Sequence, residues 1–245
     1  MKTNLSVNLN KVALLRNQRL SNSPCVLDVA RLVVDAGAQG ITVHPRPDSR
    51  HIRHSDVREL SALIAGEFPG NVEFNVEGYP SSDFLALVKE IRPTQVTLVP
   101  DSPDQKTSDH GWDLRLESKR LRPIVSDLRA QGIRVALFVE PEAESMPLVR
   151  EVGADRIELY TESYARAFEK GDFESTLSTF GAAANAATAN GLGVNAGHDL
   201  TVENLPAFKR RVPMVAEVSI GHAITADALQ LGFPMAVRKY LAAIA

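Results

Sequence analysis

Residues 34–44 read Val-Asp-Ala-Gly-Ala-Gln-Gly-Ile-Thr-Val-His, a helix end, a glycine turn and a β-strand in succession. A similar passage, Glu-Val-Gly-Ala-Asp-Arg-Ile, occupies residues 151–157. In both, a helix stops at a glycine and one small residue leads into an apolar strand. Turns of this kind join a helix to the next parallel strand, so the two passages predict repeated βα units.

Short apolar runs recur along the chain with helical stretches between them, as this pattern requires. The predicted strands are Leu5–Leu9, Gly40–His44, Val72–Val76, Gln95–Val99, Arg134–Val139, Arg156–Tyr160, Gly191–Asn195 and Ala216–Ile220. Eight such strands in 245 residues are close to the roughly 250 residues typical of a (β/α)8 barrel. The sequence therefore predicts an α/β protein, a single TIM-barrel domain over residues 1–245 with extra short helices.

The helices between the strands carry familiar start and stop signals. A helix is expected over Phe84–Ile91, stopped by Pro93, and another over Leu116–Ala130. We expect one final helix over Ala223–Ala243. The segment Asp101–Asp113 is rich in Asp, Ser, Pro and Gly and is either a mobile active-site loop or a plain surface loop.

Composition excludes several classes of function. The formal net charge is −3 and no run of Lys or Arg occurs, which argues against a nucleic-acid-binding protein. The single cysteine, Cys25, allows no intrachain disulfide. Neither a signal peptide nor an apolar run of about 18 residues is present, so we expect a cytoplasmic protein without a membrane span.

Three of the six histidines follow predicted strands directly: His44, His198 and His222. Active sites of (β/α)8 barrels are built where the strands end and the following loops begin. These imidazoles therefore share one rim, and imidazole exchanges protons near neutral pH, at an ordinary pKa of about 6.5. The rim is a candidate acid–base centre.

Phosphate binding is the second chemistry indicated at this rim. Arg46, Arg50 and His51 follow the second strand and offer charge and forked hydrogen bonds. Gly197 and Gly221 permit close approach to the backbone after the seventh and eighth strands, where barrels commonly bind phosphate.

A carboxylate is expected to complete the acid–base centre. Glu73, Asn75 and Glu77 alternate along the third strand and so share one of its faces. If that face lines the barrel, burial raises the pKa of a carboxyl group and makes it a usable base.

These motifs together resemble the pyridoxine 5′-phosphate synthase family over essentially the whole chain. The stretches that carry the resemblance are Asn8–Asn17, Gly40–Arg46 with Arg50-His51-Ile52, Asn71-Val72-Glu73, Leu98-Val99-Pro100, Asn195–Thr201 and Ile220–Ile224. The resemblance implies a (β/α)8 barrel that condenses 3-amino-2-oxopropyl phosphate with 1-deoxy-D-xylulose 5-phosphate. The products are pyridoxine 5′-phosphate, inorganic phosphate and water, and neither a metal nor another cofactor is required.

The resemblance also assigns roles to residues of this chain. The acid–base residues of the family fall on His44, Glu73 and His198. Its contacts to the amino ketone fall on Asn8, Arg19, Gly221 and His222, and its contacts to the deoxyxylulose phosphate fall on Asn10, Lys11, Arg46, His51 and Thr107. The family forms a homo-octamer, a tetramer of dimers.

Two departures from the family pattern affect the substrate-binding residues. Many members carry Asp-His where this chain has Asn10-Lys11, which places an amide and a fixed cation beside the deoxyxylulose phosphate. Asp199 stands where some members have glycine, so a backbone contact to substrate is expected to change.

Three other functions remain compatible with the same residues. The first is a sugar-phosphate aldolase that forms a Schiff base through Lys11, the only lysine at a predicted strand end. The second is a metal-dependent hydrolase that uses His44, His198 and His222, although the chain lacks a His-x-His pair. The third is a phosphate-ligand-binding protein without catalysis.

Overall fold

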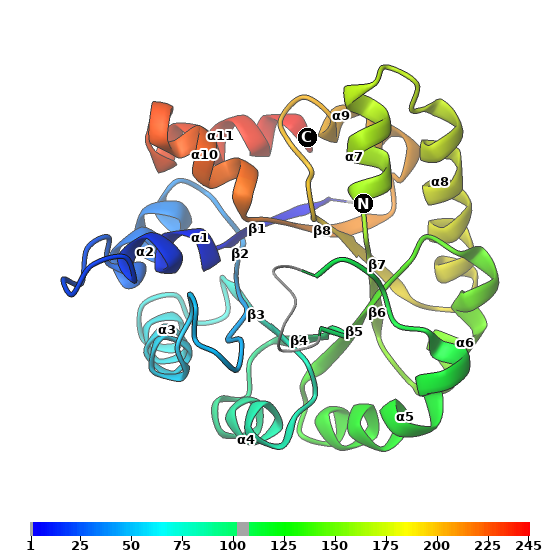
Figure 1. Ribbon diagram of the computed structural model, residues 1–245, viewed down its shortest axis with the longest axis horizontal. Coiled ribbons are helices and arrows are strands. Elements are labelled where there is room, and N and C mark those ends of the chain that lie inside the picture. The colour runs from blue at the N-terminus through cyan, green and yellow to red at the C-terminus, as the bar shows by residue number, and fades with distance from the viewer. Residues whose placement is uncertain (1, 102–107) are drawn as a thin grey trace.

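Eight parallel strands close into a barrel in the order β1 to β8 in this computed structural model, which describes residues 2–101 and 108–245. Helices surround the ring of strands (Figure 1). The strands are β1 Asn4–Asn8, β2 Gly40–Val43, β3 Glu73–Gly78, β4 Gln95–Leu98, β5 Arg134–Val139, β6 Arg156–Leu159, β7 Gly193–Ala196 and β8 Val215–Ile220. The predicted (β/α)8 architecture is confirmed, while the prediction that residues 1–245 form one domain stays a prediction.

The outer layer consists of one or more helices after each strand. Its elements are α1 Asn10–Arg16, α2 Val26–Asp35, α3 His54–Glu67, α4 Ser82–Ile91, α5 Leu114–Ala130, η1 Ala143–Ser145, α6 Met146–Val152, α7 Glu162–Glu169, α8 Glu174–Ala189, α9 Leu205–Arg211, α10 His222–Leu231 and α11 Phe233–Ala243. The single final helix expected over 223–243 is wrong. Gly232, at φ +74°, ends α10, and Pro234 lies in the first turn of α11.

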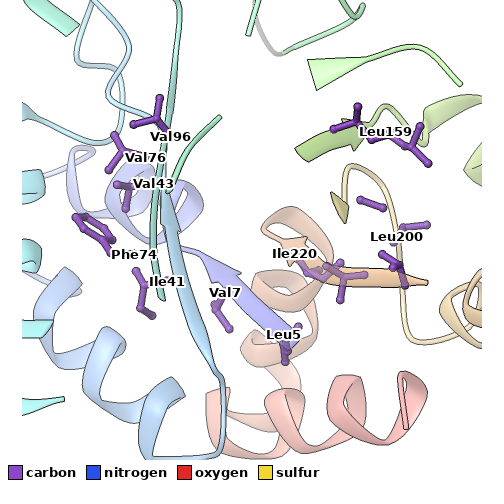
Figure 2. Packing of buried hydrophobic residues seen from close by; sticks show 14 of the residues in the cluster. Leu5, Val7, Ile41, Val43, Phe74, Val76, Val96, Leu159, Leu200 and Ile220 are labelled. Carbon is purple, nitrogen blue, oxygen red and sulfur yellow. The ribbon is translucent and has the colours of Figure 1, made fainter. Parts of the chain in front are cut away.

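Apolar side chains of the strands point outward and pack beneath the helices. Val7, Ile41 and Phe74 belong to one large cluster of buried apolar residues, part of which is seen in Figure 2. Successive strand residues face opposite sides of the sheet, so the residues between them face the barrel interior. The hydrophobic core is therefore a shell between sheet and helices.

The barrel interior is polar, and its side chains bond one another from strand to strand. The Ser6 and Thr42 hydroxyls lie 2.7 Å apart, the Asn75 amide donates to Thr42 at 3.4 Å, and the Thr97 hydroxyl donates to Asn75 at 3.1 Å. Polar residues alternate with apolar ones in β1 and β3, for example. Buried polar groups are costly unless they are hydrogen-bonded, and these groups satisfy one another.

A buried ion pair fixes the first helix to the loop that follows β2. Arg16 at the end of α1 contacts Asp56 in the first turn of α3, at 2.5 Å. The Asn17 amide donates to the His51 carbonyl at 2.8 Å. These bonds hold the residues that begin α1 beside those that follow β2, so both segments reach the same rim in fixed positions.

Candidate active site

A cavity of about 1100 Å³ opens at the carboxyl ends of the strands. Ten of the thirteen residues predicted for the site line it: Asn8, Asn10, Lys11, His44, Arg46, His51, His198, Asp199, Gly221 and His222. Arg19 lies on the exposed turn after α1 and is not among the lining residues. Thr107 lies outside the described residues. Glu73, the thirteenth, is at the other end of its strand.

Glu73 lies at the amino end of β3 and does not line the cavity, so its role in acid–base chemistry stays a prediction. Glu73 opens β3 opposite Gly40, and both its oxygens accept from Arg134, at 2.7 and 3.2 Å. Burial raises the pKa of Glu73, but the hydrogen bond and charge of Arg134 outweigh burial and hold that pKa below its ordinary value. Glu73 faces the interior as expected, yet it lies four residues, about 13 Å, below the cavity rim.

Glu77, on the same face of β3 as Glu73, is the glutamate of this strand that lines the cavity. The tripeptide Asn-Val-Glu occurs twice in succession, at 71–73 and 75–77, and the resemblance was matched to the first copy. Only the second copy ends at the carboxyl end of β3, where Glu77 lies 3.9 Å from His44 Nδ1. The pairing of β3 with β2 separates the two copies. Glu73 pairs with Gly40 at the start of β2, whereas Val76, the residue before Glu77, pairs with Val43 at the end of β2.

Burial strongly perturbs the carboxyl groups of the cavity floor. Burial, followed by the charges of Glu158, Asp101 and Glu217, raises the pKa of Glu77 well above its ordinary value. Burial likewise raises the pKa of Glu158 to about 7. Glu158 lines the cavity, and within the described residues its Oε2 has no hydrogen-bond partner. An inward Glu between Ile157 and Leu159 is the sequence signal that would have identified it.

The surroundings of His44 favour its neutral form. Burial, with the charges of Arg46 and Arg50, lowers the pKa of His44 to about 3. The backbone N–H of His44 donates to the Asn10 side-chain oxygen at 2.9 Å, and the Asn10 N–H donates to Asn8 at 2.9 Å. Asn10 thus supplies the acceptor oxygen that an aspartate would supply there, so its replacement of Asp keeps this contact.

The cationic end of the cavity is built on the loop after β2. Arg46 pairs with the buried Asp101, to which the Ser108 hydroxyl also donates, at 2.9 Å. Burial, followed by the interaction with the neighbouring His44 imidazole and the positive charge of Arg46, lowers the pKa of His51 to about 3. Because His51 Nδ1 accepts from the Ile52 N–H at 2.9 Å, its proton lies on Nε2, which is a donor.

A second end of the cavity is formed by the loops after β7 and β8. A Cβ atom on Gly197 would lie 2.0 Å from the Ser219 carbonyl oxygen, so β7 and β8 approach closely only because residue 197 is glycine. Gly221 caps the ten-residue helix α10, which begins at His222 beside Asn8. The amino end of a helix carries unpaired N–H groups and partial positive charge, a suitable place for an anion.

No metal site is apparent in residues 2–101 and 108–245, where no group of three or more His, Cys, Asp or Glu side chains is arranged to hold an ion. Over the same residues, no helix has the length and apolar character needed to cross a membrane.

A family model described as "Pyridoxal phosphate biosynthesis protein PdxJ" matches residues 5–245. The chain belongs to this family. Among PdxJ relatives, the pyridoxine 5′-phosphate synthase of Brucella anthropi is 53% identical over 246 residues, with 100% of each chain covered. That of Mesorhizobium japonicum is 54% identical over 244 residues, with 99% of each chain covered. The resemblance inferred from the motifs is confirmed.

Solved structures share the barrel with this PdxJ chain at low sequence identity. A tryptophan synthase structure from Mycobacterium tuberculosis has a TM-score of 0.67 at 12% identity and covers 99% of this chain and 93% of its own. An N-(5′-phosphoribosyl)anthranilate isomerase from Pyrococcus furiosus has a TM-score of 0.61 at 12% identity, covering 99% and 98%. These similarities concern the fold alone.

One carboxyl group below the cavity makes stability depend on pH. Burial, and then the negative charge of Glu73, raises the pKa of Glu217 to about 8. The folded chain therefore keeps a proton that the unfolded chain loses above about pH 4.3. The stability associated with this group is complete below that pH and is lost as the pH rises toward 8.

We expect Glu217→Gln to remove this dependence, since the amide is neutral at every pH. The free energy of unfolding of the variant should exceed that of the parent at pH 8, by up to about 1.4 kcal/mol for each pH unit above the unfolded pKa. At pH 5 the difference should shrink to at most about 1 kcal/mol. Thermal unfolding at both pH values measures this, with the exposed Glu59→Gln in α3 as control. An equal effect of Glu217→Gln at both pH values would contradict the assignment.

Proposed function

We propose that this chain condenses 3-amino-2-oxopropyl phosphate with 1-deoxy-D-xylulose 5-phosphate to form pyridoxine 5′-phosphate, inorganic phosphate and water. Membership of the PdxJ family and the names of its relatives support this reaction. The observation that carries it is the layout of the cavity. Two groups of anion-binding residues stand at its two ends, and titratable side chains with perturbed pKa values lie between them.

The deoxyxylulose phosphate binds at the end formed by Arg46 and His51. A guanidinium and a neutral imidazole that donates from Nε2 suit a phosphate dianion through charge-assisted hydrogen bonds. Lys11 lines the same cavity and adds a second positively charged group. Arg46 already pairs with Asp101, so the phosphate exchanges places with that carboxylate or shares the guanidinium with it.

The amino ketone phosphate binds at the end formed by Gly221 and His222. The first N–H groups of α10 and the His222 imidazole serve as donors to its phosphate. Asn8, whose amide donates to Glu77 at 3.4 Å, lies between this end and the carboxyl groups. The reacting amine and ketone are thereby brought over Glu77 and Glu158. Arg19 is exposed on the turn after α1, so a contact between Arg19 and the amino ketone phosphate requires that this turn move toward the cavity.

The titratable residues between the two ends of the cavity transfer the protons of the reaction. The amine of one substrate attacks the ketone of the other, and loss of water from this adduct needs an acid, which the protonated Glu77 supplies. Ring closure then needs a base to remove a proton beside the imine and donors around the departing phosphate. His44, neutral at pH 7, accepts protons, and His198 returns them to leaving hydroxyl groups.

The imine forms between the substrates, so this reaction uses no lysine of the enzyme. That separates it from the alternative, an aldolase that forms a Schiff base through Lys11. Borohydride reduction in the presence of the deoxyxylulose phosphate distinguishes the two. A covalent adduct on Lys11, located by mass spectrometry, would favour the aldolase.

Incubation of the purified protein with both substrates tests the proposed reaction. We expect pyridoxine 5′-phosphate and inorganic phosphate in equal amounts, with neither formed when one substrate is omitted. Absence of both products under conditions in which the protein is folded would overturn the proposal.

We further propose that the chain works in the cytoplasm as a homo-octamer, a tetramer of dimers. Exposed apolar side chains on neighbouring helices support association: Leu15 of α1, Leu32 of α2, Leu229 of α10 and Met235 of α11 are 44–77% exposed. These helices also lie near one another in Figure 1. Light scattering should give eight times the chain mass, and Leu229→Glu should lower that mass. A monomer in the parent protein would contradict the octamer.

A further inference from the structure

The backbone of Asp199 adopts a conformation that residues other than glycine rarely take. Its φ is +62°, and in the described part of the chain only Ser49 and Arg92 share this feature among non-glycine residues. The left-handed region is sterically unfavourable for residues with a Cβ, although aspartate tolerates it better than most. Such strain persists where the surrounding structure requires it, frequently at functional sites.

The strained conformation places the Asp199 carboxylate against His198. The Asp199 Oδ2 lies 2.9 Å from His198 Nδ1, and both side chains line the cavity. The backbone around the pair is held in place, because the Asn204 amide donates to the Asp199 carbonyl at 3.2 Å. The Thr161 hydroxyl donates to the His198 carbonyl. The loop after β7 therefore sets the direction and the distance of the contact between Asp199 and His198.

The charge of Asp199 determines which nitrogen of His198 carries the proton. The hydrogen bond to His198 holds the pKa of Asp199 below its ordinary value despite burial, and the charges of His222 and Lys11 act in the same direction. An ionised carboxylate only accepts hydrogen bonds. The hydrogen between the two side chains must then be on Nδ1 of the imidazole, and a neutral His198 has its lone pair on Nε2.

We propose that Asp199 is a positioning residue, which holds neutral His198 in the tautomer with the proton on Nδ1 so that Nε2 exchanges protons with the substrates. The inference rests on the proposed function, because it assigns a proton-transfer role to His198. The ring itself is further restrained by Tyr160, whose ring centre lies 5.2 Å away in an edge-on contact. Glu158 contributes the other nearby carboxyl group.

Two substitutions of Asp199 separate this role from a structural one. Asp199→Asn keeps the shape and tolerates φ +62°, but its amide donates to Nδ1 and moves the imidazole proton to Nε2. Asp199→Gly relieves the backbone strain and only removes the acceptor. We expect kcat to fall about 10²–10⁴-fold in Asp199→Asn, as in other carboxylate–imidazole pairs, and less in Asp199→Gly. The KM values for both substrates should change less than threefold.

A spectroscopic measurement tests the tautomer without reference to activity. In the ¹⁵N spectrum of the histidine-labelled protein, at a pH where the ring is neutral, His198 should have a protonated Nδ1 in the parent and a protonated Nε2 in Asp199→Asn. The His198→Gln spectrum assigns the signal. Arg92→Gly, which relieves a φ of +46° at the end of α4, is the matched control and should leave kcat and the His198 signal unchanged.

The outcomes distinguish this inference from the proposed function. A parent protein with the proton on Nε2, or an Asp199→Asn variant with parental kcat, overturns the role of Asp199 while pyridoxine 5′-phosphate is still produced. A parent protein that forms no product, yet has the proton on Nδ1, keeps the tautomer assignment and overturns the function. A purely structural role would instead lower the melting temperature of the Asp199 variants and leave the tautomer intact.

Discussion

We expect Glu77→Gln to lower the turnover of the two substrates strongly and to leave the fold intact. The carboxyl group lies at the cavity floor, 3.9 Å from His44 Nδ1, and its raised pKa makes it both a proton donor and, once ionised, a base. Glutamine has nearly the same shape but exchanges no proton. General acid–base groups contribute about 10²–10⁴-fold to rates, so we expect kcat to fall by that factor. Steady-state kinetics with both substrates, together with thermal unfolding, measures the effect.

Glu73→Gln is the matched control, the same substitution on the same strand. Glu73 accepts two hydrogen bonds from Arg134 at the far end of the barrel, so the variant should keep kcat within about threefold. Its free energy of unfolding should fall by up to about 3 kcal/mol, because a hydrogen bond between charged groups is weakened. The opposite pattern, an inactive Glu73→Gln and an active Glu77→Gln, would restore the assignment that the sequence suggested.

His198→Gln is expected to have the second large effect, a fall in kcat of about 10²–10⁴-fold. The imidazole lines the cavity, and the neighbouring Glu158 and Asp199 carboxyl groups suit a group that takes up and returns protons. The amide of glutamine preserves hydrogen bonding but cannot shuttle protons. Substrate binding should change little, so the loss appears in kcat and not in KM, as rapid-quench or steady-state assays of phosphate release will show.

Two other histidines provide comparisons for this result. His110→Gln, at an exposed site outside the cavity lining, should leave all kinetic constants unchanged. His222→Gln, at the start of α10, should raise the KM for the amino ketone phosphate with a smaller effect on kcat. If His198→Gln also changed KM alone, His198 would be a binding residue and not a proton carrier.

The fold and most of the site could be predicted because they depend on local signals. Gly37 and Gly153, both with positive φ, mark the turns that lead from a helix into the next strand. The histidines follow strands whose ends can be recognised in the sequence. These signals fixed which rim each residue reaches. They were sufficient to place His44 and His198 at the same cavity.

The height of a residue along its strand was harder to predict. Glu73 and Glu77 have the same parity, so alternation alone gives both the same face, and only the pairing register with β2 separates them. Gly232 interrupts the final helix in a stretch that otherwise has helical periodicity. The hydrogen bonds between polar side chains of the barrel interior could not be predicted either, because they join residues of different strands.

The close approach of β7 and β8 at Gly197 limits how this sequence can diverge. Even one methyl group at residue 197 would collide with the Ser219 carbonyl and push the two strands apart. His198 follows this position on one strand, and Gly221 follows on the other, so a single substitution would displace a proton carrier and a phosphate contact together. Divergent descendants that keep the chemistry are therefore expected to keep this glycine even where they exchange the charged residues around it.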